Sequence, residues 1–264
     1  MKICALQLPT LPMSSARLDY YLQICANEGV ELVCIGDYVL NNFFRDLVKM
    51  PKNLIKEQSD MRKTIMNDLC KKYDISIVAP LILQKGRGFI KVCAKFSKKQ
   101  NKFYEQNFLM PYSHWDEKSF FVNSLTKVNI PTFNINRIKF AIINAYETNF
   151  DVCWQEIMKK KVDVVITPSA CTFFSETRWK ELLKTRAFTN SMYVLRINRV
   201  GEHKYENEIW NFYGQSMLIN PFGDIVNELG KDEEMLIVDI DKKEINKARS
   251  LWKFSDQLEN IEVL

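Results

Sequence analysis

Short apolar runs typical of β-strands alternate with amphipathic stretches typical of α-helices along the chain. Val, Ile and Phe dominate several apolar runs, as expected for sheets that are covered on both faces. This order of elements predicts an α/β protein with two β-sheets packed face to face and helices outside. The strand candidates are Lys2–Leu8, Glu31–Ile35, Ile75–Leu83, Phe89–Phe96, Lys139–Asn144, Asp163–Thr167, Tyr193–Asn198, Ser216–Asn220 and Leu236–Ile240. The helix candidates are Ala16–Asn27, Leu54–Tyr73, Val152–Lys161, Glu176–Thr189 and Lys243–Trp252.

The length of 264 residues allows one large α/β domain with a sizeable core. No repeat, linker or low-complexity segment interrupts the pattern. We therefore expect residues 1–264 to form a single domain.

The composition, with 47% hydrophobic and 26% charged residues, is that of an ordinary soluble protein. No segment reaches the roughly 18 apolar residues that a membrane span needs. The first residues imitate a signal peptide, but Gln7, Pro9 and Pro12 interrupt their apolar run, which is also needed as the first core strand. We expect a cytoplasmic protein without a membrane span.

The seven cysteines form neither a disulfide framework nor a zinc site. Cys4, Cys34 and Cys93 lie in strand-like runs, no CxxC spacing occurs, and the only histidines are His114 and His203. Reduced, mostly buried thiols are the expectation, and we predict no metal and no cofactor.

The formal net charge of +5 comes from an excess of lysine. The lysines cluster in places such as Lys98–Lys99, Lys159–Lys161 and Lys242–Lys243, which fall at helix ends and turns. Solvated lysines are expected there, whereas nucleic-acid binding favours one arginine-rich stripe with interleaved aromatic residues. We therefore expect no nucleic-acid partner.

Several short motifs follow one another through most of the chain. They are KICALQL at Lys2–Leu8, ELVCIGDYVL at Glu31–Leu40, FYEQNFLMPY at Phe103–Tyr112, KFAIINAYE at Lys139–Glu147, DVVITPSA at Asp163–Ala170, RAF at Arg186–Phe188 with NRVG at Asn198–Gly201, and FYGQSMLINPFG at Phe212–Gly223. This succession resembles the nitrilase, or carbon–nitrogen hydrolase, superfamily. The resemblance implies an αββα sandwich that dimerises to αββα–αββα. It also implies hydrolysis by a cysteine nucleophile, a glutamate base, an oxyanion-binding lysine and a second glutamate.

At the four positions of that catalytic set, this sequence departs from the family pattern. The resemblance aligns the glutamate base with Asp37, the lysine with Gln106, the second glutamate with Ser113 and the cysteine with Ala145. A methyl group cannot attack a carbonyl carbon, and loss of one oxyanion donor costs roughly 10²–10³ in rate. Asp37 is then left as a solitary carboxylate that is protonated, partly solvated or paired with a cation that the sequence does not identify.

Two functions follow from this degenerate set. The first is a catalytically inactive member of the superfamily, a pseudoenzyme with no catalytic residues, which binds a protein partner or a retained ligand. The alternative is an active amidase or N-carbamoyl amino acid hydrolase with a rearranged site. A relocated nucleophile at Cys171 is one form of that rearrangement, although free cysteine more often behaves as a small hydrophobe. A laboratory replacement of cysteine by Ala145 would not explain Gln106 and Ser113.

Other residues near the degenerate positions are candidates for ligand binding. The binding candidates are Tyr112, Trp115, Tyr146, Cys171 and Phe173. Aromatic residues in this number, with Phe174 and Trp179, more often fill a core or a subunit interface.

The resemblance also implies pairing through the helices at Val152–Lys161 and Glu176–Thr189. The apolar residues of these two helices are Trp154, Ile157, Trp179, Leu182, Leu183 and Phe188. Such a set can bury an apolar interface, so we expect a homodimer that presents a second surface to a protein partner.

Overall fold

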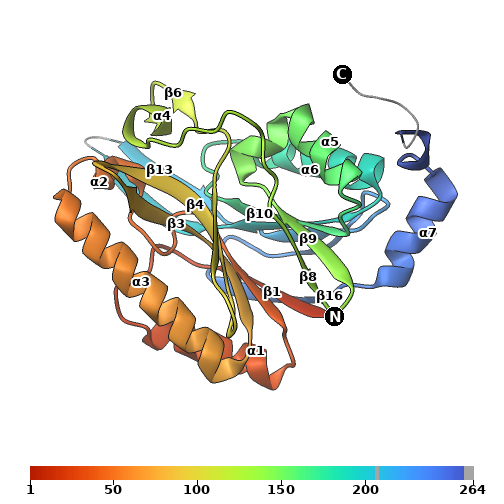
Figure 1. Cartoon of the computed structure of the whole chain (residues 1–264), viewed down its shortest axis with the longest axis horizontal. Helices are drawn as coiled ribbons and strands as arrows, with labels where there is room; N and C mark the ends of the chain where they lie inside the picture. The colour runs from red at the N-terminus through yellow and green to blue at the C-terminus, as the bar shows by residue number, and fades with distance from the viewer. Residues whose placement is uncertain (206–207, 259–264) are drawn as a thin grey trace.

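Two mixed β-sheets form the centre of the computed structural model, which describes residues 1–205 and 208–258 (Figure 1). The first sheet has the order β16 (Glu234–Asp239), β1 (Lys2–Gln7), β2 (Leu32–Ile35), β3 (Ser76–Lys85), β4 (Gly88–Phe96) and β5 (Lys102–Glu105). The second has the order β15 (Ile225–Glu228), β14 (Met217–Ile219), β11 (Tyr193–Asn198), β10 (Val164–Ser169), β9 (Ile138–Ile142) and β8 (Thr132–Ile135).

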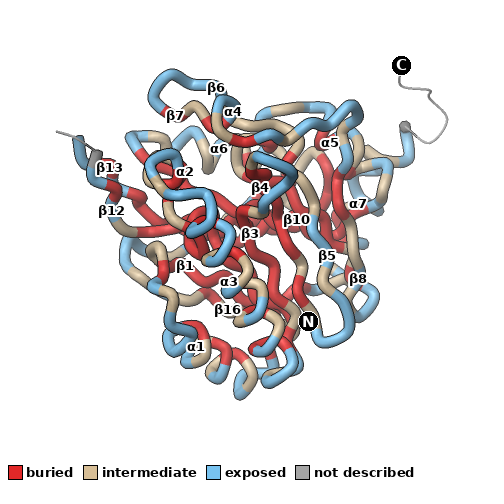
Figure 2. Tube along the Cα trace, turned by 60° about the vertical axis from the view of Figure 1, so that its left-hand side comes forward, coloured by how far each residue is buried: buried red, intermediate tan, exposed pale blue. Residues whose placement is uncertain are grey.

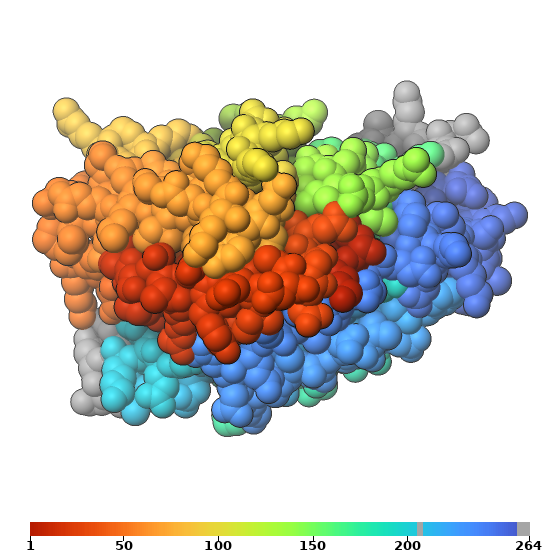
Figure 3. Space-filling view, turned by 90° about the horizontal axis from the view of Figure 1, so that it is seen from below, coloured from red at the N-terminus to blue at the C-terminus, as the bar shows by residue number. Residues whose placement is uncertain are grey.

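Parallel strands lie in the middle of both sheets. In the first sheet β1, β2 and β3 run parallel, and in the second β9, β10 and β11 do so. The outer pairs β1–β16 and β11–β14 are antiparallel. Seen from below, the N-terminal segments therefore lie beside the C-terminal ones (Figure 3).

Alternate residues of one strand pack into two different hydrophobic cores, which explains why the strands are apolar on both faces. In β1, Ile3 and Ala5 face the second sheet, whereas Cys4 and Leu6 pack under the helices. The buried residues consequently fill the interior between and behind the sheets (Figure 2).

Four helices cover the outer faces of the sheets. On the first sheet lie α1 (Ala16–Asn27) and α3 (Lys52–Tyr73), and on the second lie α5 (Asp151–Lys159) and α6 (Glu176–Asn190) (Figure 1). The predicted αββα sandwich is thus confirmed.

The remaining elements are short or peripheral. They are α2 (Phe44–Leu47), β6 (Pro111–Tyr112), β7 (Trp115–Asp116), α4 (Glu117–Phe120), the 3₁₀ helix η1 (Ala145–Asn149), β12 (Val200–Tyr205), β13 (Glu208–Tyr213), α7 (Lys242–Trp252) and the 3₁₀ helix η2 (Asp256–Leu258). The antiparallel pair β12–β13 is absent from our sequence predictions. Charged residues such as Glu202 and Lys204 alternate with apolar ones there, and the segment carries no continuous apolar run.

Three of the apolar residues predicted for a dimer interface lie in the core of the chain. Trp154, Ile157 and Leu183 are almost fully buried on the inner sides of α5 and α6, where they pack against the second sheet. Trp179, Leu182 and Phe188 are half-buried, and Phe188 contacts the ring of Trp252 at 5.2 Å between centroids.

Candidate functional site

A cavity of about 320 Å³ opens where the parallel strands of both sheets end. Asp37 follows β2, Ala145 follows β9 and Cys171 follows β10, so segments far apart in sequence meet there. The described lining residues are Asp37, Lys91, Gln106, Met110, Tyr112, His114, Trp115, Asn144, Ala145, Tyr146, Asn149, Ala170, Cys171, Thr172, Phe173, Ser175, Arg178, Trp179 and Leu182.

The backbone around Asp37 is held tightly against the second sheet. A Cβ at Gly36 would lie 3.2 Å from the backbone nitrogen of Arg199 and 3.3 Å from the carbonyl oxygen of Ser169, so only glycine fits there without movement. The backbone N–H of Asp37 donates to the Ser169 carbonyl at 3.1 Å. Tyr38 has a left-handed φ of 54°, and Arg199 donates to its carbonyl at 3.1 Å. These contacts fix the direction of the Asp37 carboxylate.

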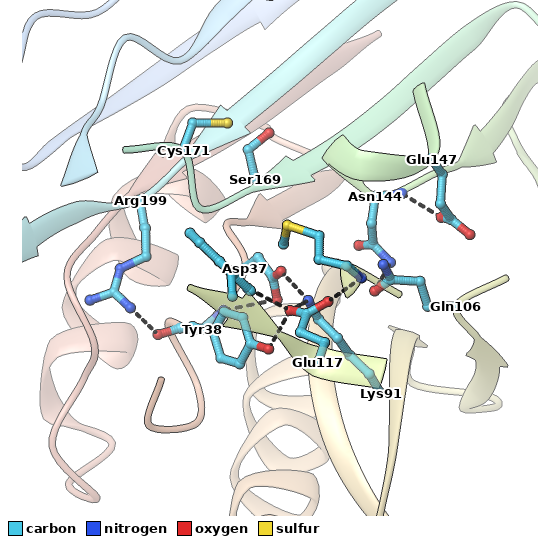
Figure 4. Close-up of polar contacts among 12 residues, drawn as sticks. Asp37, Tyr38, Lys91, Gln106, Glu117, Asn144, Glu147, Ser169, Cys171 and Arg199 are labelled. Atoms are coloured by element: carbon cyan, nitrogen blue, oxygen red, sulfur yellow. Dashed lines mark hydrogen bonds and ion pairs between the residues drawn. The ribbon is translucent and has the colours of Figure 1, made fainter. Parts of the chain in front are cut away.

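Lys91 of β4 joins two buried carboxylates. Its Nζ lies 2.6 Å from Oδ2 of Asp37 and 2.7 Å from Oε1 of Glu117 (Figure 4). It also lies 4.4 Å from the centre of the Tyr38 ring. The side chains of Lys91, Asp37 and Glu117 are only 2%, 7% and 0% exposed, so water screens their attraction weakly. Lys91 is the cation that the sequence left unidentified.

Glu117, the first residue of α4, is the second carboxylate of the site. Its Oε1 accepts hydrogen bonds from the Tyr38 hydroxyl at 2.5 Å and from Nε1 of Trp115 at 3.2 Å. Its Oε2 accepts from the backbone N–H of Met110 at 3.4 Å. Ser113, which was expected to replace this glutamate, lies in the exposed turn between β6 and β7 and does not line the cavity. The short strands of this β6–β7 segment carry no apolar pattern from which the burial of Glu117 could be predicted.

Burial and charge act against each other in this cluster. Burial raises the pKa of Asp37, the charge of Lys91 opposes this, and the charge of Glu117 adds to it. Burial works to lower the pKa of Lys91, but the two carboxylates outweigh it and raise that pKa. Lys91 is therefore a cation at neutral pH, and Asp37 accepts a proton more readily than an exposed aspartate.

Gln106 lies directly after β5 and lines the same cavity as a neutral group. Its Nε2 donates to the carbonyl of Phe108 at 2.7 Å, and its Oε1 accepts from Nδ2 of Asn144 at 3.0 Å. Its backbone N–H donates to the carbonyl of Lys91 at 3.0 Å, because β4 and β5 are neighbours. The cation of this cavity wall therefore lies on β4, at Lys91, and not at Gln106, where the resemblance predicted the family's lysine position.

Ala145 begins η1 and presents a methyl group to the cavity. The turn is fixed by Glu147, whose Oε2 accepts from the backbone N–H of Asn144 at 2.7 Å and whose Oε1 accepts from that of Asn107 at 2.6 Å. Burial raises the pKa of Glu147, against these hydrogen bonds. The turn that the resemblance aligns with the family's cysteine is therefore well ordered by hydrogen bonds, and it presents no thiol at position 145.

Cys171 is the cysteine that lines the cavity among the described residues, and it is 7% exposed. Its backbone N–H donates to Oδ1 of Asn198 at 2.7 Å. Burial raises the pKa of its thiol, while the charge and hydrogen bond of Arg196 oppose this. All seven cysteines are free and buried.

The structure places every binding candidate from the sequence on the cavity wall. Tyr112, Trp115, Tyr146, Cys171 and Phe173 all line it. Phe173 has a left-handed φ of 60° and contacts the Trp210 ring at 5.1 Å between centroids. Phe174, by contrast, is 95% exposed and does not line the cavity.

Sequence reasoning missed Lys91 and Glu117. Lys91 is a cation in the middle of the apolar run Phe89–Phe96, and a charge in a strand covered on both faces is a signal that was available. No such signal marked Glu117, because the sequence WDEK at Trp115–Lys118 is typical of a solvated turn.

In the described residues, no group of three or more His, Cys, Asp or Glu side chains could hold a metal ion. Among the same residues, no helix is long and apolar enough to cross a membrane.

Comparisons with known proteins agree on one family. The sequence model of a family described as carbon-nitrogen hydrolase matches residues 16–250. A "hydrolase in agr operon" from Staphylococcus lugdunensis is 26% identical over 240 residues, which cover 89% of this chain and 97% of that protein. A deaminated glutathione amidase from Dictyostelium discoideum is 28% identical over 113 residues, which cover 42% of this chain and only 38% of that protein.

A solved structure agrees with the fold. A carbon-nitrogen hydrolase from Helicobacter pylori superposes with a TM-score of 0.86 over 99% of both chains at 17% identity. At that identity the likeness shows the fold alone.

The expectation that this chain is not an enzyme is wrong. Its relatives are named as an amidase and a hydrolase, which points to an enzyme. The physical reason lies in the charges: Gln106 and Ser113 suggested a neutralised site, whereas Lys91 and Glu117 supply a cation and a second carboxylate beside Asp37.

Proposed function

Because this chain belongs to the carbon–nitrogen hydrolase family, we propose that it is an amidase-type hydrolase with a rearranged site. It cleaves the carbon–nitrogen bond of a small amide or N-carbamoyl compound, and a water molecule replaces the missing cysteine as nucleophile. The observation that carries this proposal is the position of Lys91 between Asp37 and Glu117, at 2.6 and 2.7 Å.

Each group of the cluster has one task in this reaction. Asp37 is the general base, since its carboxylate lines the cavity and its raised pKa suits proton transfer nearer neutral pH. Lys91 also lines the cavity and stabilises negative charge on the carbonyl oxygen. Glu117 holds Lys91 in place from outside the cavity and keeps it protonated.

The proposed steps balance without any further reactant. A water molecule loses a proton to Asp37 while its oxygen attacks the carbonyl carbon, and the carbonyl oxygen becomes an oxyanion beside Lys91. Asp37 then returns the proton to the amide nitrogen as the carbon–nitrogen bond breaks. An amide gives a carboxylic acid and ammonia or an amine. An N-carbamoyl compound gives the free amine and carbamic acid, which decomposes to carbon dioxide and ammonia.

The side chain at position 145 supports attack by water. Ala145 lacks the sulfur atom of a cysteine, so space for a small nucleophile is left on the same wall as Asp37 and Lys91. Cys171 is the rival nucleophile, but burial raises the pKa of its thiol and disfavours the thiolate.

Release of ammonia from short amides and N-carbamoyl amino acids tests the function. We expect turnover by the wild type and a loss of about 10²–10³ in kcat for Asp37→Asn and for Lys91→Met. Lys95→Met, in the same strand, is the matched control, because Lys95 does not line the cavity. No turnover across the panel, or equal losses in the control, would overturn the proposal.

Mass spectrometry during turnover distinguishes attack by water from attack by the thiol of Cys171. Attack by water leaves the mass of the protein unchanged, whereas attack by Cys171 adds the acyl group of the substrate. An adduct that disappears in Cys171→Ser would transfer the nucleophilic role to that thiol.

A further inference from the structure

We propose that the protein has a second binding site, separate from the reaction cavity, for a small α-amino acid in its zwitterionic form. The carboxylate of this ligand binds the guanidinium of Arg199, and its ammonium group binds the carboxylate of Asp46. The site does not rest on the proposed hydrolysis, because Arg199 and Asp46 do not line the reaction cavity.

The first observation is a further cavity of about 290 Å³, which is lined by residues of α2 and β12 and of the segment after β1. Among the described residues, the two cavities share no lining residue. Thr10 lines this second cavity, and its hydroxyl donates to the carbonyl of Tyr38 at 2.8 Å. The volume lies at the lower end of the roughly 300–1,000 Å³ that is typical of ligand sites, which suits a small molecule.

The second observation is the fixed guanidinium of Arg199, which lines this cavity. Its Nη1 donates to the carbonyl of Tyr38 at 3.1 Å and its Nε to that of Val200 at 3.4 Å. Its face lies on the Phe212 ring, with Cζ 4.1 Å from the ring centre. Within the described part of the chain Nη2 makes no hydrogen bond, and Figure 4 shows it turned away from Asp37. The guanidinium is therefore held in one orientation with an N–H edge left for a ligand.

The charge of Arg199 is only partly balanced by its surroundings. The residue is 2% exposed, and no carboxylate of the described residues forms an ion pair with it. Burial lowers the pKa of Arg199 to about 10, although the charges of Asp37 and Asp46 act to raise it. Arg199 is thus a cation at neutral pH, and its burial costs free energy that a bound carboxylate would offset through charge-assisted hydrogen bonds.

The third observation is the carboxylate of Asp46, which lines the same cavity from α2. Its side chain is 47% exposed, and its Oδ2 lies 3.5 Å from Nδ1 of His203. Burial lowers the pKa of His203 while Asp46 acts to raise it, so the imidazole is neutral at pH 7 and leaves the negative charge of Asp46 in place. Glu202, an exposed residue, adds a second negative charge to the lining.

These charges favour a ligand that carries both signs. A simple anion would be repelled by Asp46 and Glu202, and a simple cation would leave the charge of Arg199 unbalanced. An α-amino acid carries its carboxylate and its ammonium group on one carbon atom, so both can bind within a small cavity. Limited volume restricts the side chain of the ligand to a short one.

Calorimetry with L-alanine, propionate and ethylamine tests the site, because the last two compounds each lack one charged group of the first. We expect alanine to bind with a Kd at least about tenfold lower than either of the others. Asp46→Asn should reduce the affinity for alanine to that for propionate. Asp60→Asn is the matched control, since this aspartate is similarly exposed, at 44%, pairs with Lys56 at 2.6 Å and lies outside the cavity.

A second variant tests the other half of the site. Arg199→Gln should abolish the binding of alanine and of propionate, with circular dichroism as the check on folding; if it does not fold, Asp46→Asn decides. No binding of alanine by the wild type, equal affinity for alanine and propionate, or alanine binding unchanged in Asp46→Asn would each overturn the inference. Alanine bound in the reaction cavity instead would give the last of these results, because Asp46 does not line that cavity.

Discussion

The ammonium nitrogen of Lys91 lies 2.6 Å from Oδ2 of Asp37, and both side chains are buried. Lys91 belongs to β4 and Asp37 follows β2, with β3 between these strands in the sheet. The contact therefore spans two strand pairings, and the same nitrogen of Lys91 also pairs with Oε1 of Glu117 at 2.7 Å.

Removal of the central charge should destabilise the protein at neutral pH. Lys91→Met leaves Asp37 and Glu117 as unpaired buried carboxylates, and we expect a loss of about 3–5 kcal/mol in the free energy of unfolding. Urea unfolding measures this change in the free energy of unfolding. The neutral variant Asp37→Asn/Lys91→Met/Glu117→Gln should be more stable than Lys91→Met alone, whereas the half-buried control Lys95→Met should cost less than about 1 kcal/mol. A triple variant less stable than Lys91→Met would contradict the electrostatic account.

The raised pKa of Asp37 should appear in the pH dependence of amide hydrolysis. The active form is the carboxylate, so activity falls as pH decreases through the pKa of Asp37 in the folded protein. Because burial raises that pKa, the acid limb of kcat/KM should lie above the range of an exposed aspartate. A limb within the ordinary range, or one that persists in the residual activity of Asp37→Asn, would assign the titration to another group.

Ala145→Cys should create a covalent route. The new thiol would share the cavity wall with Asp37 and Lys91, which can accept its proton and stabilise the oxyanion. Mass spectrometry during turnover should show a protein mass increased by the acyl group of the amide. The adduct should be absent in Ala145→Cys/Asp37→Asn, and its appearance there would exclude Asp37 as the base.

Gly36→Ala should disturb the site through the backbone. The added Cβ would lie 3.2 Å from the backbone nitrogen of Arg199, so the ends of β2 and β11 must separate by a few tenths of an ångström. We expect a cost of about 1–3 kcal/mol in stability and a fall in kcat of about 10²-fold from the displaced carboxylate. Gly230→Ala is the control, because the nearest atom there, Oε2 of Glu234, is 3.9 Å away. Unchanged kcat in Gly36→Ala would show that this close approach does not position Asp37.

The regular elements were predictable because their patterns are local. The helix predicted at Ala16–Asn27 and the strand predicted at Tyr193–Asn198 have those bounds in the structure. The predicted helix at Leu54–Tyr73 begins two residues earlier, at Lys52, where Pro51 is suited to a helix start. The hairpin β12–β13 was missed, because our predictions relied on continuous apolar runs and its strands contain charged residues.

Some residues of the site could also be predicted from local sequence patterns. Asp37 and Ala145 follow predicted strands, Gln106 lies within a motif segment, and the structure brings all three to one cavity. Ser113 was assigned from the family resemblance, and in a short irregular segment such an alignment does not specify side-chain direction or burial.

The sequence by itself determined the central strands and the covering helices, the αββα order and the absence of a thiol at position 145. It did so because hydrophobic periodicity and residue identity belong to each segment alone. The tertiary structure decided which charges meet: Lys91 pairs with Asp37 and Glu117, and Arg178 faces the same cavity from α6. Those relationships depend on strand order and side-chain direction across the sheets. The electrostatics of a buried site arise from distances between groups that the chain order does not contain.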